Sequence, residues 1–143
     1  MSPGARPELV RTAVVDAGVV LTRLDRRRRS HRRVVSLFDQ CARGDVALYL
    51  STVNLAEVLQ HGRPYSEATG LDLVAMVTGF GIALHSPDAE VARVAAELAT
   101  VPDLSLADRF AAATARLLRA RLHTTDPVLV RALRRGPVPV TGY

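Results

Sequence analysis

The chain has 143 residues, 48% of them hydrophobic and 23% charged, which suits one folded domain and excludes intrinsic disorder. All 19 basic residues are arginine, and the absence of lysine excludes a Walker A loop and a Schiff-base enzyme. The net charge of +5 permits binding of a polyanion, while an aromatic content of 4% disfavours a stacking platform for single-stranded bases.

Three features of the sequence predict a cytoplasmic protein with no membrane partner. The single cysteine, Cys41, leaves no internal disulfide and suits a reducing compartment. Residues 1–11 contain no apolar core of the kind found in signal peptides. The longest apolar stretch, residues 73–84, is too short to span a bilayer.

The secondary structure predicted along the chain alternates between strands and helices. Residues 1–11, with two Pro and one Gly, are expected to be a loose lead-in to a domain over residues 12–143. Strands are predicted at residues 13–15, 46–50, 81–84 and 122–124, and at 138–141, where Pro139 permits only an edge strand. Helices are predicted at residues 19–24, 54–60, 66–78, 87–99, 105–120 and 128–134. One more helix is predicted to follow the charged residues 26–33 and to end at residue 43.

This alternation predicts an α/β fold, with a central parallel sheet and helices on both faces. The helix at residues 105–120 is predicted to be the longest. Its apolar stripe is expected to consist of Leu106, Phe110, Ala113 and Leu117.

Four acidic residues follow predicted strands or begin predicted helices: Asp16, Glu57, Asp108 and Asp126. In an open parallel sheet such positions converge on one edge, where ligands bind. Converging carboxylates repel one another and raise their pKa values unless a cation is present. Because the ligands are all oxygen, the sequence favours Mg²⁺ or Mn²⁺ over zinc.

Each acid also has a purely structural interpretation. Asp16 ends a strand, where an Asp often opens a turn. Glu57 and Asp108 each stand three residues after an Asn or a Ser, which is the spacing of a capping box. Asp126 precedes a proline, as an N-cap residue often does. The sequence leaves these alternatives open.

Other chemistries find less support in the sequence. The four histidines form no i, i+4 pair, and one cysteine cannot complete a zinc site. Residues 79–81, Gly-Phe-Gly, lack the third glycine of a dinucleotide loop. No Gly-x-Ser-x-Gly elbow is present, although a Ser-His-Asp triad stays open.

Four segments, in order along the chain, resemble the motifs of the PIN-domain family, and most of all its VapC-type toxins. They are VVDA at residues 14–17, STVNLAEV at 51–58, LSLAD at 104–108 followed by AAATA at 111–115, and TTD at 124–126. The resemblance covers roughly residues 12–141 and includes all four acids.

The resemblance implies a PIN-like α/β nuclease fold and a Mg²⁺-dependent endoribonuclease, with Mn²⁺ as a substitute ion. Asp16 and Asp108 would be the principal metal ligands, Glu57 would complete the acidic cluster, and Asp126 would bind metal directly or through water. The resemblance further implies an RNA substrate (tRNA or another structured RNA), a homodimer and a cognate VapB-like antitoxin.

One position departs from the family pattern. The family usually has Ser or Thr two residues after the first Asp, where this chain has Gly18. A hydroxyl that would steady the acid or a bound water is therefore missing, so a catalytically inactive PIN-like module that binds RNA or a protein stays an alternative. An aspartyl-phosphate phosphatase with Asp16 as nucleophile is a third candidate, but that class normally needs an Asp at position 18 and a Lys.

The only block of charge, residues 26–33, supplies the candidates for RNA binding. Arginine forks suit phosphate oxygens, and the block follows the segment after Asp16. We therefore expect Arg27, Arg28 and Arg29 to contact RNA, the alternatives being a solvated surface or an antitoxin contact.

Overall fold

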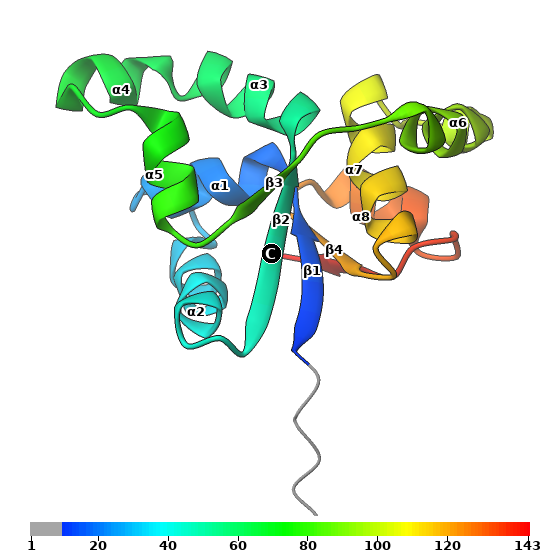
Figure 1. Ribbon diagram of the computed structural model, residues 1–143, viewed down its shortest axis with the longest axis horizontal. Helices are drawn as coiled ribbons and strands as arrows, with labels where there is room; N and C mark the ends of the chain where they lie inside the picture. The colour runs from blue at the N-terminus through cyan, green and yellow to red at the C-terminus, as the bar shows by residue number, and fades with distance from the viewer. Residues whose placement is uncertain (1–9) are drawn as a thin grey trace, which may run out of the picture.

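Five parallel strands form the centre of the fold in this computed structural model, which describes residues 10–143 (Figure 1). They are β1 (Arg11–Val15), β2 (Val46–Ser51), β3 (Ala83–His85), β4 (Arg121–Thr124) and β5 (Val140–Gly142). Their order in the sheet is β3-β2-β1-β4-β5. The chain leaves β1 toward β2 and leaves β4 toward β5, so the connections diverge between β1 and β4. The carboxyl ends of these two strands therefore flank a switch point, where parallel sheets bind ligands.

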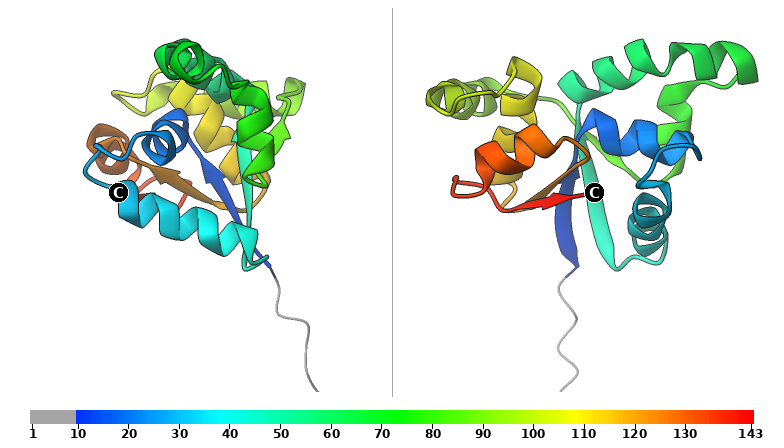
Figure 2. Two further views of the ribbon diagram at one scale, coloured as in Figure 1. Left: turned by 90° about the vertical axis from the view of Figure 1, so that its left-hand side faces the viewer. Right: turned by 180° about the vertical axis from the view of Figure 1, so that it is seen from behind.

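Helices cover both faces of the sheet, as the sequence predicts (Figure 2). One layer contains α1 (Ala17–Leu24), α2 (His31–Ala42), α3 (Thr52–His61), α4 (Arg63–Thr69) and α5 (Leu73–Gly79). The other contains α6 (Ala89–Glu97), a 3-10 turn (Leu98–Thr100), α7 (Leu106–Leu117) and α8 (Pro127–Leu133). None of the helices in residues 10–143 is long and apolar enough to cross a bilayer.

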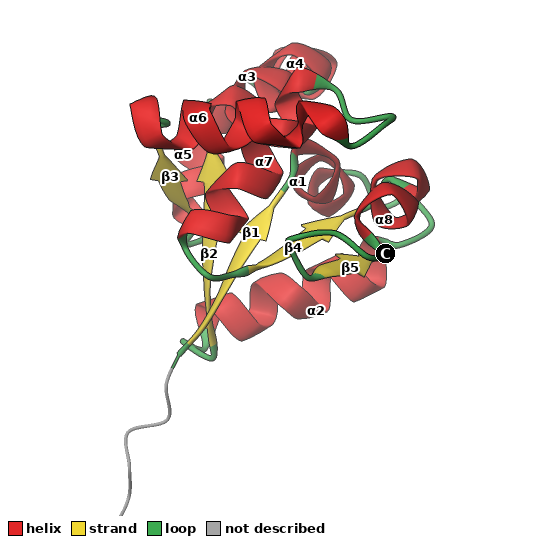
Figure 3. Ribbon diagram, turned by 90° about the vertical axis from the view of Figure 1, so that its right-hand side faces the viewer, coloured by secondary structure: helices red, strands yellow, loops and turns green. Residues whose placement is uncertain are grey.

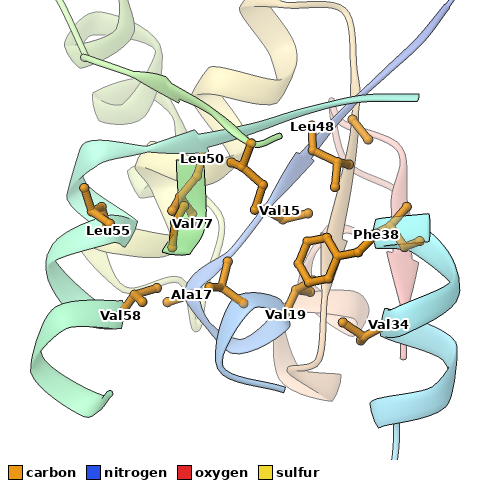
Figure 4. Packing of buried hydrophobic residues seen from close by; sticks show 14 of the residues in the cluster. Val15, Ala17, Val19, Val34, Phe38, Leu48, Leu50, Leu55, Val58 and Val77 are labelled. Atoms are coloured by element: carbon orange, nitrogen blue, oxygen red, sulfur yellow. The ribbon is translucent and has the colours of Figure 1, made fainter. Parts of the chain in front are cut away.

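Residues 13–15 of the central strand β1 are buried, which explains why this part of the strand is an unbroken apolar run. Val15 packs into the core on the α2 side, and Val14 packs into the core on the α7 side. Figure 4 shows the first core, where Val15 meets Leu48 and Leu50 of β2 and Phe38 of α2. This packing fixes the end of β1, and with it the position of the residue that follows.

The second core depends on the small residues of α7. Residues 111–115 of this helix, four Ala and one Thr, are all buried, because α7 packs against the strands, α3 and α6 at once. The predicted apolar stripe is therefore wrong at its first member, since the Leu106 side chain is 64% exposed. Phe110 and Leu117 are half-buried, and Ala113 is fully buried.

Several predicted boundaries need correction. The helix predicted at residues 66–78 is two helices, α4 and α5, because Gly70 adopts a left-handed conformation with φ of 68° and Asp72 caps the next helix. α7 has 12 residues and only equals α2 in length. Strand β1 begins at Arg11, the last residue of the expected lead-in, whose residues 1–9 lie outside the described part. The strand after Pro139 does lie at the sheet edge.

Candidate active site

Asp16 stands directly after β1 and is held by its neighbours on two sides. Its side chain is buried, with 8% of the residue exposed. Oδ1 accepts a hydrogen bond of 3.0 Å from the Val19 backbone N–H, so Asp16 is the N-cap of α1. Oδ2 accepts a hydrogen bond from the Thr124 hydroxyl at the end of β4. The carboxylate therefore lies at the switch point in a single orientation.

The surroundings of Asp16 disfavour its negative charge. Burial is the main reason that its pKa rises from 3.8 to about 6. The hydrogen bonds from Thr124 and Val19 act against this rise, and the negative charges of Asp108 and Asp126 add to it. A cation bound beside Asp16 would offset both the desolvation and the repulsion.

Glu57 has no role in capping a helix, which corrects one structural interpretation. The N-cap of α3 is Ser51, whose hydroxyl accepts a hydrogen bond of 3.3 Å from Val53 N–H. Glu57 therefore lies past the first turn, on a helix face that leaves it half-buried. Burial raises its pKa, the charge of Asp108 raises it further, and His61 lowers it. Within residues 10–143 the Glu57 carboxylate accepts no hydrogen bond.

Asp108 and Asp126 do cap helices, as their structural interpretations predict. Asp108 forms a reciprocal capping box with Ser105: its backbone N–H donates to Ser105 Oγ at 3.1 Å, and its Oδ2 accepts from Ser105 N–H at 3.0 Å. Asp126 Oδ1 accepts from Val128 N–H at 2.8 Å. In the described part of the chain, the second oxygen of each carboxylate is not hydrogen-bonded. Capping and ligand binding are therefore compatible at both residues.

The four acids line one cleft of about 450 Å³ at the carboxyl ends of β1 and β4. They come from four separate segments, and the sheet topology brings them together. Other residues in the lining include Gly18, Arg28, Asn54, His61 and Thr125. The structure thus joins all the acids that the sequence singled out, and their roles as ligands belong to the proposal below.

Asn54 is a residue of this cleft that the sequence analysis considered only for helix capping. It is 2% exposed, and its Nδ2 donates to the Ala107 carbonyl at 3.3 Å. Its Oδ1 is buried without a hydrogen-bond partner among residues 10–143. Such an atom costs free energy unless a ligand satisfies it. Its place one turn before Glu57 on α3 is the signal by which the sequence could have indicated it.

The donor set fits a hard divalent cation. It consists of carboxylate oxygens, a buried amide oxygen without a partner and nearby hydroxyls, with no sulfur. In residues 10–143, no three His, Cys, Asp or Glu side chains are placed to hold one ion directly. Mg²⁺ usually keeps several of its waters and takes one or two carboxylates from the protein, so this arrangement suits it.

Gly18 allows a different hydroxyl to enter the cleft. A Cβ atom at Gly18 would collide with Thr125 Oγ1 and would lie 3.5 Å from Asp16 Oδ1. Thr125 therefore fills the space that a side chain at position 18 would need. The expected lack of a hydroxyl to steady Asp16 is also corrected, since Thr124 donates a hydrogen bond to that carboxylate.

The three candidate RNA-binding arginines lie in the turn between α1 and α2, and they differ from one another. Arg28 lines the acidic cleft. Arg27 is 91% exposed, does not line the cleft and forms an ion pair of 3.1 Å with Asp25, which also lies 4.0 Å from Arg28 Nε. Arg29 is exposed and does not line the cleft. The geometry favours only Arg28 as a group that could meet a ligand of the acids.

The site is thus an acidic cleft at the switch point of a small parallel sheet. A family model described as the PIN domain matches residues 13–133, which is most of the chain. The protein therefore belongs to the PIN domain family. A comparison with curated proteins found no match.

Solved structures with this fold include chains of toxin–antitoxin complexes. A chain of VapBC2 from Rickettsia felis, solved with a promoter DNA fragment, has a TM-score of 0.68 at 16% identity over 92% of this chain and 98% of that chain. A toxin–antitoxin complex from Klebsiella pneumoniae has a TM-score of 0.67 at 21% identity, with coverage of 92% and 98%. FitAcB from Neisseria gonorrhoeae has a TM-score of 0.65 at 20% identity, with coverage of 91% and 96%. At these identities the likeness supports the fold alone.

Proposed function

We propose that this PIN-domain protein is a Mg²⁺-dependent endoribonuclease, with Mn²⁺ as a substitute, that acts as the toxin of a toxin–antitoxin pair. The observation that carries the proposal is the convergence of Asp16, Glu57, Asp108 and Asp126 on one cleft. The raised pKa of Asp16 and the unsatisfied Asn54 oxygen support a cation there. The substrate would be tRNA or another structured RNA in the cytoplasm.

The residues of the cleft would have different roles in hydrolysis. Asp16 and Asp108 would be the principal ligands, Asn54 would hold the ion directly or through water, and Asp126 would hold it through water. When bound, the ion would supply Lewis acidity, which would lower the pKa of a water and offset negative charge on the phosphodiester oxygens. Thr124 orients Asp16 by its hydrogen bond.

Glu57 and Arg28 would act on the substrate side of the cleft. Glu57 is free of hydrogen bonds within the described residues and has a raised pKa, which suits it to accept the proton of the attacking water. Arg28 would donate N–H groups to a phosphate oxygen beside the scissile bond. The positive charge of Arg28 would therefore offset the repulsion between the acidic cluster and an RNA backbone.

Cleavage of a labelled RNA pool in Mg²⁺ or Mn²⁺ tests this proposal. We expect cleavage to stop in EDTA, to be lost in Asp16→Asn with the principal metal ligand, and to fall at least about 100-fold in Glu57→Gln, on the order of a lost acid–base group. Asp88→Asn is the matched control, because Asp88 caps α6 through Val91 N–H and does not line the cleft. Cleavage that persists in EDTA would refute the metal mechanism. RNA binding without cleavage at any metal concentration would favour the inactive module.

The partners follow from the same proposal. Several solved structures with this fold are VapBC complexes, which supports a VapB-like antitoxin as partner of this chain. We also propose a homodimer. Expression of the wild-type protein should slow bacterial growth, and co-expression of a cognate antitoxin should restore it. Asp16→Asn at equal soluble expression is the control, and normal growth with the wild-type protein would contradict the toxin assignment.

A further inference from the structure

A second pocket, of about 710 Å³, lies between α2 and strands β1, β4 and β5. Four of its lining residues are arginines from three segments: Arg11 of β1, Arg33 of α2, and the pair Arg119 and Arg121 at the start of β4. Its lining contains no acidic residue and shares no residue with the acidic cleft. Figure 3 shows α2 passing along the side of the sheet where β5 and the chain end lie. We call this site the arginine pocket.

The positive charges of the arginine pocket are not neutralised by acids. Arg33 donates to the Gly142 carbonyl at 3.1 Å, Arg121 donates to the Val140 carbonyl at 3.1 Å, and Arg11 donates to Gln40 Oε1 at 3.0 Å. The ion pairs found within residues 10–143 involve none of the four arginines. Neutral acceptors thus fix part of the forks of Arg11, Arg33 and Arg121 and leave their other N–H groups for a ligand.

The remaining groups of the pocket are polar or positively charged. Arg119 follows the end of α7 in the left-handed conformation of a helix C-terminus, with a φ of 52°, and its N–H donates to the Arg116 carbonyl at 3.1 Å. His123 shares a hydrogen bond of 2.7 Å with the Tyr143 hydroxyl. Burial, followed by the charges of Arg121 and Arg11, lowers the pKa of His123 to about 4. Ser36 and Thr141 add hydroxyl donors to the lining.

We propose that the arginine pocket binds phosphate groups of RNA and serves as a second contact for a strand that also occupies the acidic cleft. Phosphate matches arginine forks in geometry and charge. Along β1, Arg11 of the pocket and Asp16 of the cleft are five residues apart, roughly 17 Å at the rise of a strand. One RNA strand is long enough to reach both. This inference rests on the proposed function for the identity of the ligand.

Binding of a fluorescent single-stranded RNA in EDTA, measured by anisotropy over a salt series, tests the proposal without requiring cleavage. In Arg11→Gln/Arg119→Gln, loss of two phosphate contacts should weaken binding roughly tenfold near 0.15 M salt and reduce the salt slope by about 1.4. Arg93→Gln/Arg131→Gln is the control of equal charge, since these arginines are exposed on α6 and α8 and do not line the pocket. Where the double variant unfolds, Arg119→Gln alone should reduce the slope by about 0.7.

Each outcome decides the proposal. Equal affinity and slope in the pocket variant and its control would overturn it. Titrations of the wild-type protein and the pocket variant with AMP and inorganic phosphate form a second part of the experiment. If the pocket variant loses AMP binding but keeps RNA binding, the pocket would be assigned to a free nucleotide instead. If the pocket variant loses binding of a glutamate-rich peptide but keeps RNA binding, the pocket would be assigned to an acidic protein partner. RNA binding through the pocket without cleavage would refute the proposed nuclease and leave this inference intact.

Discussion

The Asp16 carboxylate is buried, accepts two hydrogen bonds and lies near two other acidic residues. Its pKa is about 6 in the folded protein and 3.8 in the unfolded chain. The folded state therefore binds the proton more tightly, and the contribution of Asp16 to stability is complete below pH 4 and lost as the pH rises through 6. This direction is opposite to that of a carboxylate in a salt bridge.

The Asp16→Asn variant should reveal this loss in metal-free protein. Relative to wild type, its free energy of unfolding should rise between pH 4 and pH 6 by up to about 3 kcal/mol, because asparagine stays neutral and keeps the cap. Urea denaturation of both proteins at each pH provides the measurement. Taking the difference cancels His123, whose lowered pKa changes stability in the opposite direction. A difference that does not vary with pH would contradict the prediction.

Substitutions at Gly18 and Thr125 should be energetically coupled, because a side chain at position 18 would need the space that Thr125 Oγ1 occupies. Gly18→Ala places a Cβ against Thr125 Oγ1 and should destabilise the protein by about 1–3 kcal/mol. In a Thr125→Ala background only Thr125 Cβ remains, 3.7 Å away, which is an ordinary contact. There the same substitution should be neutral or stabilising, because alanine favours helix. A double-mutant cycle measured by urea denaturation would show additivity if the prediction is wrong.

At the scale of elements, three of the four acids are also helix caps. Asp16 caps α1, Asp108 completes the capping box of α7, and Asp126 caps α8. A cap needs a side-chain oxygen that accepts a hydrogen bond, which Asp supplies, and a helix that follows a parallel strand begins at the carboxyl edge of the sheet. The positive ends of these helices also favour negative charge at that edge. Structural and functional requirements therefore select the same residue type.

A pair of substitutions in the α7 capping box separates the two roles. Ser105→Ala removes the hydroxyl that accepts from Asp108 N–H and should cost about 1 kcal/mol with RNA cleavage largely kept. Asp108→Asn keeps an oxygen that can accept from Ser105 N–H, so the fold should hold while cleavage is lost. Melting temperature and cleavage are measured on the same samples. Full cleavage by Asp108→Asn would show that Asp108 caps α7 and has no role in cleavage.

The element boundaries show how far local patterns extend. The ends of β1 and β2 follow from short apolar runs that stop at polar residues, and the structure confirms both strands. The division at Gly70 could have been found, because Gly followed by Asp two residues later is an end signal and a start signal together. The buried alanines of α7 could not, since their burial depends on close packing by neighbours distant in sequence.

At the scale of the whole molecule, metal binding should appear as stability. An ion that binds only the folded protein stabilises it by about 2.7 kcal/mol at 100 times its dissociation constant, a rise in melting temperature of roughly 5 °C or more. Mn²⁺ should produce this rise in wild type and in Asp88→Asn, but not in Asp16→Asn or Asp108→Asn. Thermal melts with and without EDTA give the measurement. An equal rise in all four proteins would place the ion outside the cleft.

The sequence by itself determined the α/β class, most of the strands and helices, and the identity of the four acids. These depend on periodicity, capping and turn chemistry, which act over a few residues and are therefore visible locally. Only the tertiary structure decided that the acids share one cleft, that Asn54 leaves an oxygen unpaired in it, and that Thr125 fills the space beside Gly18. It also assembled the arginine pocket from residues 11, 33, 119 and 121. Those arrangements arise from the pairing of β1 with β4 and the packing of α2, which join residues more than a hundred positions apart.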